Sequence, residues 1–304
     1  MMRELLLFLS RQAWLRKWME RSDAAQRFTR RFVAGETLEE ALAACARLQK
    51  DKILATLDHL GENVTSLEEA VAARDAYLEA LRRIAGRGLK ATISLKLTQM
   101  GLDFSEPACL ENVRALARRA REGSTMAEID MESTAYTDRT LRVVEQVAGE
   151  CGHRCVRAVI QAYLFRSAAD IDRLNRLNIP VRLVKGAYHE PESAAFPDKK
   201  DVDRNYVALM KSLLDHGADP AIATHDERIL GEAMRYASER GLGKEQFEFQ
   251  MLYGIRRGLQ QRLANQGYRV RVYVPYGTAW YPYFMRRLAE RPANALFLLR
   301  NLFR

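Results

Sequence analysis

The chain alternates short β-rich runs with amphipathic helical runs, and this alternation limits its fold more than any other feature. Eight runs are rich in apolar and β-branched residues: 53–57, 91–97, 127–132, 156–163, 181–188, 221–226, 247–252 and 270–275. The segments between them show helical periodicity, at 66–84, 111–121, 138–150, 168–177, 203–214, 227–239 and 255–264. Strands that alternate with helices predict parallel βαβ units, and eight such units predict a (β/α)8 barrel.

An open, doubly wound sheet is the competing architecture for this order of elements. It normally places a glycine-rich phosphate turn directly after an early strand. The Gly-x-Gly sequence at Gly86 and Gly88 precedes a strand instead, so that fingerprint is absent. The residues before the first strand have apolar positions three and four apart, which is typical of helices. We therefore predict an N-terminal helical segment of residues 1–50, followed by a barrel domain of residues 51–304.

The first residues predict an amphipathic helix with Leu5, Leu9, Trp14, Leu15 and Trp18 on one side. We expect this helix to pack on the main domain; the alternative is a helix that lies on a membrane surface. The apolar run of five residues is shorter than a signal-peptide core. No stretch reaches the ~20 apolar residues of a membrane span, so we expect a cytoplasmic protein.

The net charge of +9 raises nucleic acid and anionic membranes as partners. The basic residues are spread along the chain with acidic residues between them, and no zinc-finger spacing or RNA-binding aromatic motif accompanies them. We therefore expect no nucleic-acid partner. Of the four cysteines only Cys151 and Cys155 lie close in sequence, without a second pair at metal-binding spacing. We expect reduced thiols and no metal.

Polar residues stand near the carboxyl end of every predicted strand, which is where barrel enzymes build their active sites. They are Asp58, Lys96, Asp130, Glu132, Gln161, Arg182, Lys185, Thr224, His225, Gln250 and Tyr273. Buried charges must pair with each other or with a ligand. The set is strongly cationic, which suits a ligand that carries phosphates and a carboxylate. Arg286 and Arg287 add two guanidinium groups that can hold a carboxylate at two points.

Seven sequence motifs give these residues a specific resemblance. They read LDHLGE (57–62), SLKL (94–97), IDME (129–132), RLVKGAY (182–188), ATH (223–225), FQMLYG (249–254) and RRLAE (286–290). In this order they resemble the monofunctional proline dehydrogenases of bacteria and the dehydrogenase domain of the bifunctional proline utilisation enzymes. The resemblance implies a distorted (β/α)8 barrel with non-covalently bound FAD. It also implies oxidation of L-proline to Δ1-pyrroline-5-carboxylate, a membrane quinone as electron acceptor, and peripheral contact with the inner face of the cell membrane.

The resemblance assigns one group of residues to the substrate. Lys96, Arg286 and Arg287 resemble the family's clamp on the proline carboxylate. Tyr273 and Leu252 resemble the residues that pack on the proline ring, and Tyr188 is expected at the same pocket. Asp130 matches the family's active-site aspartate, which either positions Tyr273 and the cations or acts as a general base. Glu290 is expected to orient an arginine, and Glu62 to pair with an arginine as a gate.

A second group of residues is implied to hold the flavin. Arg182 resembles the residue near the flavin N5 atom, where a cation stabilises the negative charge gained on reduction. The other implied contacts are Gln161, Lys185, Gly186, Ala187, Thr224 and His225. Two alternatives stay open: a barrel aldolase that forms a Schiff base on Lys96 or Lys185, and a basic nucleic-acid-binding protein favoured by charge alone.

Overall fold

The computed structural model describes residues 12–22, 25, 29–61, 64–188 and 190–289, without the side chains of residues 13, 15, 16, 20 and 286–289. Several sequence predictions therefore fall outside the described residues. They are the helix positions Leu5 and Leu9, the gate residue Glu62, and Glu290 near the C-terminus. For Arg286 and Arg287 the structure gives the helix that carries them, and their side chains are not described.

Eight parallel strands form a closed barrel in sequence order. The strands are β1 (Leu54–His59), β2 (Ala91–Lys96), β3 (Ala127–Asp130), β4 (Val156–Gln161), β5 (Val181–Val184), β6 (Ala221–Ala223), β7 (Glu248–Leu252) and β8 (Arg269–Tyr276). The ring closes where β1 pairs with β8 in parallel, from Leu54 beside Arg271 to His59 beside Tyr276. The (β/α)8 prediction is confirmed. The open-sheet alternative is wrong, because an open sheet would leave β1 and β8 unpaired.

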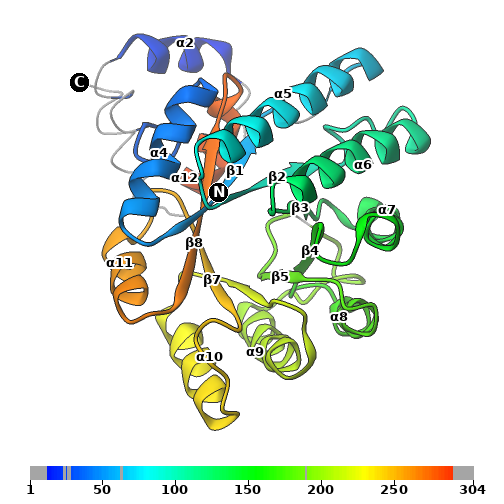
Figure 1. The fold of residues 1–304 in the computed structure, drawn as a ribbon, viewed down its shortest axis with the longest axis vertical. Coiled ribbons are helices and arrows are strands. Elements are labelled where there is room, and N and C mark those ends of the chain that lie inside the picture. The colour runs from blue at the N-terminus through cyan, green and yellow to red at the C-terminus, as the bar shows by residue number, and fades with distance from the viewer. Residues whose placement is uncertain (1–11, 23–24, 26–28, 62–63, 189, 290–304) are drawn as a thin grey trace.

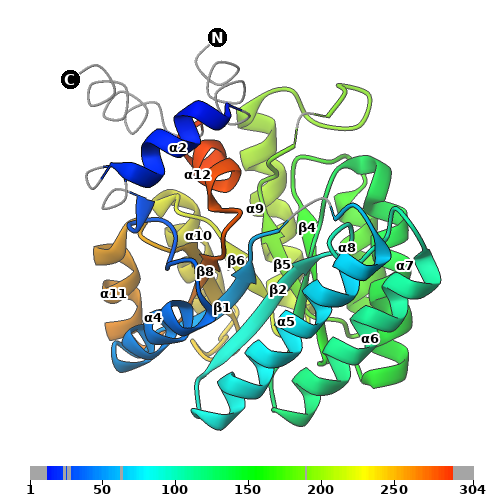
Figure 2. The same cartoon turned by 90° about the horizontal axis from the view of Figure 1, so that it is seen from above.

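Helices surround the barrel and connect its strands (Figures 1 and 2). They are α5 (Leu67–Gly86), α6 (Glu106–Glu122), α7 (Thr134–Cys151), α8 (Ser167–Arg176), α9 (Lys199–His216), α10 (Glu227–Glu239) and α11 (Arg257–Asn265). Each overlaps a predicted helix; α10 has the predicted ends, 227–239, and the ends of the others are shifted. Helix α6 begins five residues before the predicted start at 111, because Ser105 caps it by accepting a hydrogen bond from the Ala108 N–H at 3.3 Å.

Two described helices precede the barrel: α2 (Ala13–Arg21) and α4 (Leu38–Lys50). The capping box at the start of α4 is present, since the Thr37 hydroxyl accepts from Glu40 N while the Glu40 carboxylate accepts from Thr37 N. Helix α4 packs on β1 and β8. The predicted boundary at residue 50 stays a prediction. Among the described helices, none is both long and apolar enough to span a membrane.

The last described helix, α12 (Trp280–Ala289), packs on the N-terminal segment (Figure 2). Met19 of α2 is fully buried in one apolar cluster with Trp280 and Phe284 of α12. The Trp280 indole donates a hydrogen bond to a Glu36 carboxylate oxygen at 3.0 Å. Helix α2 therefore packs on the main domain, as expected, and does so along its Met19 side. The prediction that Trp14 belongs to the packed side is wrong, because its side chain is 59% exposed.

The strands bury apolar side chains on the outer face of the barrel and polar ones inside it. Leu57, Ile93 and Phe249, for example, belong to the main core beneath the helices. Hydrogen bonds between strands that are not neighbours must cross the barrel interior: Arg182 on β5 bonds Ser94 on β2, for example. Barrel interiors of this fold are usually filled by branched apolar residues. The polar interior is therefore a specific feature of this chain, and it positions the site.

Candidate active site

Four residues meet inside the barrel around the carboxyl ends of β2 and β3, and we call them the mouth cluster: Lys96, Asp130, Arg182 and Tyr273. Asp130 lies at its centre. One carboxylate oxygen accepts from the Arg182 guanidinium, and the other accepts from the Tyr273 hydroxyl at 2.7 Å. The Lys96 ammonium lies 3.6 Å from the second oxygen. The predicted substrate and flavin residues from β2, β3, β5 and β8 are thus brought together around one carboxylate.

Burial and neighbouring charge fix the protonation of Tyr273. Burial raises the pKa of the Tyr273 phenol well above its usual value, and the charge of Asp130 raises it further. The phenol therefore keeps its proton and donates a hydrogen bond to Asp130. The Arg182 guanidinium carbon lies 5.3 Å from the centre of the Tyr273 ring, within the range of a cation–π contact. Ser94 also holds Asp130, through a hydroxyl hydrogen bond of 2.8 Å.

Leu252 lies next to this cluster because it pairs in register with Tyr273 across β7 and β8. Its half-buried side chain is suitably placed to cover an apolar part of a ligand. Tyr188 lies apart from the cluster, in the loop after β5, and is 37% exposed. It neighbours Tyr163, whose pKa is raised by burial and by the nearby Glu190 and Tyr188. The structure thus supports the placement of Leu252 more directly than that of Tyr188.

A second group of charged residues lies deeper in the barrel, and the sequence analysis missed it. We call it the lower cluster: Glu128, Arg157, Glu248 and Arg271. Arg157 bonds both carboxylates, at 3.4 Å to Glu128 and 2.7 Å to Glu248. Arg271 bonds Glu248 at 2.8 Å. The side chains of both glutamates and of Arg157 are completely buried.

The arginines keep both buried glutamates charged. Burial alone would raise the pKa of Glu128, but Arg182, Arg157 and Arg271 outweigh burial and lower it. The same competition lowers the pKa of Glu248, where Arg271 and Arg157 are the main cations. Arg182 belongs to the mouth cluster but also lies 3.4 Å from Glu128. It therefore connects the two clusters.

The predicted flavin contacts lie along the ends of β4 to β6. Gln161 is held in place, because its amide donates to Glu132 O at 2.9 Å and accepts from Ala187 N at 3.4 Å. His225 accepts from Leu252 N at 3.0 Å through its Nε2 atom. That bond links the predicted flavin residues to the strand next to Tyr273.

The remaining predicted flavin contacts include Lys185, which forms ion pairs with two aspartates. The Lys185 ammonium lies 2.5 Å from Asp203 and 3.6 Å from Asp226. The Thr224 hydroxyl accepts from Asp226 N at 3.1 Å. These contacts join the loop after β5 to the loop after β6.

Gly186 allows the loop after β5 to turn at this point. Its φ of +120° is a conformation that side chains rarely adopt, and a Cβ atom there would overlap the Tyr163 ring. The turn ends β5 at Val184 and exposes Gly186 and Ala187. The sequence analysis ran this strand to residue 188, which was wrong because the glycine leaves the extended region.

Two buried guanidinium Nε–H donors have no partner within the described residues: that of Arg182 at the mouth and that of Arg157 in the lower cluster. The other two nitrogens of the Arg182 guanidinium bond Gln250, Ser94 and Asp130. A buried unsatisfied donor is costly and calls for a ligand or an ordered water. The remaining donor, beside surplus positive charge, fits a group that carries negative charge and hydrogen-bond acceptors.

The four cysteines are free and buried, as expected. Burial raises the pKa of the Cys45 and Cys109 thiols to about 12, so they stay protonated. Within the described residues no cluster of histidine, cysteine and acidic side chains has the arrangement of a metal site.

A closed barrel with polar residues inside it and a cluster of charged side chains at its mouth is the architecture of a barrel enzyme for small polar molecules. The chain belongs to the proline dehydrogenase family, because the family model described as proline dehydrogenase matches residues 41–300. Proline dehydrogenase 1 of Bacillus subtilis (strain 168) is 43% identical over 304 residues, which are 100% of this chain and 100% of that protein. The proline dehydrogenase of Deinococcus radiodurans is 43% identical, over 90% of this chain and 89% of its own length.

The fold is also shared with a solved structure. Proline utilization A from Bdellovibrio bacteriovorus, inactivated by N-propargylglycine, superposes with a TM-score of 0.81 and is 29% identical. The match covers 87% of this chain and 32% of that one, so this chain spans about a third of the longer protein. The comparisons confirm the resemblance found in the sequence and the enzyme class, an oxidoreductase of the proline dehydrogenase family.

Proposed function

We propose that this protein is an FAD-dependent enzyme that oxidises L-proline to Δ1-pyrroline-5-carboxylate and passes the electrons to a membrane quinone. The mouth cluster carries the proposal. One carboxylate, Asp130, is surrounded by Lys96, Arg182 and Tyr273 around the carboxyl ends of β2 and β3. Relatives named proline dehydrogenase match the chain over its full length. An amino acid that carries a carboxylate suits a mouth with more cations than anions.

The substrate carboxylate is proposed to bind Lys96 together with Arg286 and Arg287 of α12. Three cations around one carboxylate fix the position of the proline ring. Tyr273 and Leu252, paired across β7 and β8, would cover the ring. Tyr188 is proposed at the edge of the same pocket, with Glu290 orienting an arginine and Glu62 as part of a gate. These roles rest on the family resemblance.

Asp130 is proposed as a positioning residue for the two groups that reach the substrate. It accepts hydrogen bonds from both Arg182 and Tyr273, so it fixes the guanidinium and the ring relative to each other. A direct role as general base is the alternative. Because its two oxygens are already engaged by donors, a base would have to exchange one of these bonds for the substrate ammonium.

The residues beside the mouth suit non-covalently bound FAD. Bound FAD would supply the acceptor for the hydride that proline loses. The buried, unpartnered Nε–H of Arg182 is a donor of the kind that a flavin ring nitrogen accepts. Gln161, Lys185, Gly186, Ala187, Thr224 and His225 are the proposed contacts for the rest of the cofactor. The loop at Gly186 and Ala187 is exposed and lies directly after Lys185 in the chain.

A quinone acceptor dissolves in lipid, so the proposal includes peripheral contact with the inner face of the cell membrane. The N-terminal segment offers one surface for that contact, through the exposed Trp14 of α2. Hydrophobic insertion and attraction to anionic lipid would add.

The aldolase alternative is weakened by the surroundings of both candidate lysines. A Schiff-base lysine needs an unprotonated amine, which carboxylate neighbours disfavour. Lys96 lies 3.6 Å from Asp130, and Lys185 lies beside Asp203 and Asp226. A nucleic-acid-binding function is favoured by net charge alone.

A visible spectrum of the purified full chain separates the three functions. We expect a yellow protein whose flavin bands bleach when L-proline is added without oxygen, and do not bleach with D-proline. A colourless protein that borohydride traps on a keto acid would support the aldolase. Salt-dependent DNA binding without colour would support the nucleic-acid function. Repeating the titration with 4-hydroxyproline then defines how far the substrate class extends.

A further inference from the structure

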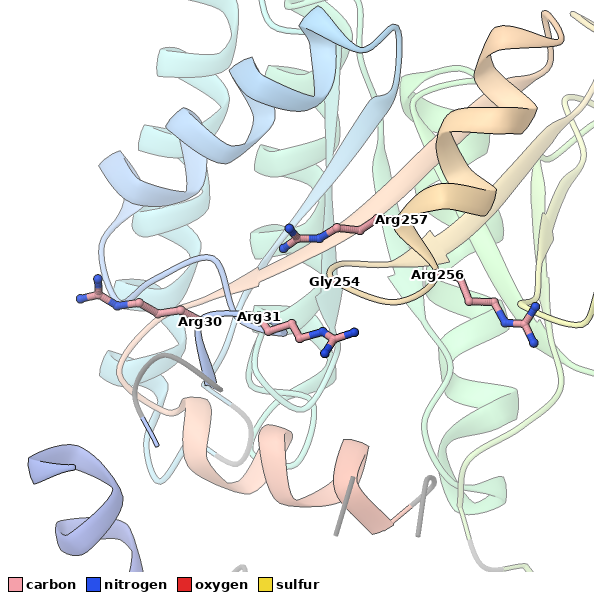
Figure 3. Close-up of a pocket in the computed structure, with 5 residues that line it drawn as sticks. All are labelled: Arg30, Arg31, Gly254, Arg256 and Arg257. Atoms are coloured by element: carbon pink, nitrogen blue, oxygen red, sulfur yellow. The ribbon is translucent and has the colours of Figure 1, made fainter. Parts of the chain in front are cut away.

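Two pairs of adjacent arginines that are far apart in sequence lie around one cavity, outside the residues assigned to proline and flavin. The cavity has a volume of about 480 Å³ and is lined by Arg30, Arg31, Gly254, Arg256 and Arg257 (Figure 3). The first pair lies between α2 and α4, and the second lies where α11 begins after β7. This arrangement of four guanidinium groups points to a binding site for a phosphate group. We call the site the arginine cavity.

The two segments meet by a close backbone contact. Gly254 has a φ of +73°, and a Cβ atom at this position would overlap the carbonyl oxygen of Arg31. A glycine is therefore required for the loop after β7 to approach the N-terminal segment. In Figure 3, Arg257 and Arg31 lie above and below Gly254, whereas Arg30 and Arg256 extend away from it in opposite directions.

Arg31 and Arg257 form the centre of the site because acidic groups do not neutralise them. Within the described residues, their side chains contact aromatic rings and no carboxylate. The Arg31 guanidinium lies 5.8 Å from the Phe32 ring centre, and that of Arg257 lies 5.7 Å from the Tyr253 ring centre. Both arginine side chains are exposed. Stacking on a ring orients the plane of a guanidinium and leaves its N–H groups available for an anion.

The other two arginines are partly engaged. Arg256 forms an ion pair with Glu227. Arg30 contributes to the lowered pKa of Glu40, after hydrogen bonds from the Thr37 and Glu36 backbone. These carboxylates leave an excess of positive charge in the cavity. Four like charges repel one another, and a dianion bound between them would relieve that repulsion.

The start of α11 adds further positive potential. No side chain caps this helix, and its first turn contains no acidic residue. Its N-cap, Arg256, has a left-handed φ of 51°, which is costly for a residue other than glycine. Backbone N–H groups at a helix start and paired guanidiniums are both characteristic of phosphate recognition. The cavity therefore suits the phosphate of a free metabolite or of a lipid headgroup.

The cavity lies at the edge of the barrel mouth, since Gly254 follows Leu252 at the end of β7 by two residues. A lipid phosphate bound there would hold the mouth near a membrane, which is where the proposed quinone acceptor would be. The site itself is independent of the proposed function, because it rests on the arginines and the α11 start alone.

The test compares three variants of the full, flavin-containing chain. Arg31→Gln/Arg257→Gln removes the two unpaired charges, and Arg31→Lys/Arg257→Lys keeps the charge but loses the fork geometry. Arg118→Gln/Arg176→Gln is the matched control, because both arginines are exposed, form no ion pair within the described residues, and lie on α6 and α8, across the barrel from α11 (Figure 1). Two probes are used: inorganic phosphate, followed by calorimetry, and vesicles of phosphatidylcholine with or without phosphatidylglycerol, followed by co-sedimentation.

We expect the Gln variant to bind at least one probe about tenfold more weakly or worse, because two charge-assisted contacts are lost. The Lys variant should lie between it and the control, and added salt should weaken binding. Loss of vesicle binding alone identifies a lipid phosphate, and loss of phosphate binding identifies a free one. Equal binding of both probes by the Gln variant and the control would overturn the inference. So would loss of flavin from the Gln variant, which would place the cofactor's own phosphates in this cavity.

Discussion

The lower cluster and the mouth cluster lie one above the other inside the same barrel, yet they differ in charge balance and exposure. The lower cluster has two carboxylates and two guanidiniums, so its charges cancel, and Asp219 and Arg269 extend it as one more balanced pair. The mouth cluster has one carboxylate and two cations. The Asp130 and Lys96 side chains are each 14% exposed, whereas Glu128, Arg157 and Glu248 are fully buried. The remaining arginines are similar in exposure, at 4% for Arg182 and 8% for Arg271.

This difference separates a structural role from a functional one. A buried network whose charges are all paired needs no ligand, and removing one member leaves an uncompensated charge. A partly exposed network with surplus positive charge has capacity for an anion. Changes in the lower cluster should therefore alter stability first, and changes in the mouth cluster should alter chemistry first.

The largest expected effect is the loss of stability when Arg157 is replaced. Arg157→Met should lower the free energy of unfolding by about 3–5 kcal/mol, because Glu128 and Glu248 would stay buried with fewer cations. Urea denaturation followed by circular dichroism measures this value. Arg118→Met, an exposed arginine on α6, is the control and should change it little. A loss below about 1 kcal/mol for Arg157→Met would show that the lower cluster is not the structural element described here.

The next effect concerns the proposed carboxylate clamp on α12. Arg286→Lys and Arg287→Lys keep charge but lose two-point geometry, and each should cost about 2–5 kcal/mol of transition-state binding. The loss should appear in kcat/KM for proline, with the yellow colour and the unfolding free energy preserved. Arg262→Lys, on the exposed side of α11, is the matched control. Unchanged proline kinetics in both α12 variants would remove the clamp from the proposal.

Lowering the pH should reduce the free energy of unfolding, because the glutamates of the lower cluster lose their charge. The folded-state pKa of Glu128 and that of Glu248 are below the ordinary value of 4.5. Their contribution is therefore complete above about pH 4.5 and is lost as the pH falls towards the folded-state values. In Glu248→Gln, the decline of unfolding free energy with falling pH should be shallower by up to about 1.4 kcal/mol per pH unit. Equal slopes would contradict the paired state of Glu248.

The smallest effect is expected for Tyr273→Phe. It removes one donor from Asp130 and keeps the ring that is proposed to cover proline. We expect kcat/KM to fall by about 1–2 kcal/mol in transition-state terms, with unfolding free energy nearly unchanged. Steady-state kinetics and urea denaturation of the same preparation test both parts. If the free energy of unfolding falls by more than the transition-state binding energy derived from kcat/KM, Tyr273 has a structural role like that of the lower cluster.

The sequence predicted Lys96 and Asp130 because they stand at the ends of apolar runs, where a polar residue is conspicuous. Arg182 and Tyr273 lie within their strands, and their roles were implied by the family resemblance. The lower cluster lies earlier in the strands. From sequence alone, a charged residue at such a position is interpreted as facing solvent, and only the closed barrel shows that it faces the interior. Period-two spacing was the available signal, since Glu128 precedes Asp130 by two residues and Arg271 precedes Tyr273 by two. Strand positions were predicted well because the β-rich runs are separated by clear helical segments.

Features that depend on backbone conformation or on distant contacts were not predictable from the pattern. Strand β5 ends before Gly186 because of that residue's left-handed φ, which the apolar pattern does not show. Arg31 and Arg257 meet only because Gly254 admits the Arg31 carbonyl. Adjacent arginine pairs were a visible signal in both segments, but nothing in either segment indicated that they would share one cavity.

The proposed division assigns stability to the lower cluster and chemistry to the mouth cluster. Its most direct test is the reduction potential of the bound flavin in Arg182→Met. Arg182 is the residue through which the mouth cluster is proposed to act on FAD, and its cation would stabilise the negative charge that reduction adds. The account predicts a lower potential than in the parent protein and slower bleaching by proline, with flavin content retained. Arg118→Met should leave the potential unchanged. A potential in Arg182→Met equal to that of the parent protein would contradict the role of the mouth cluster.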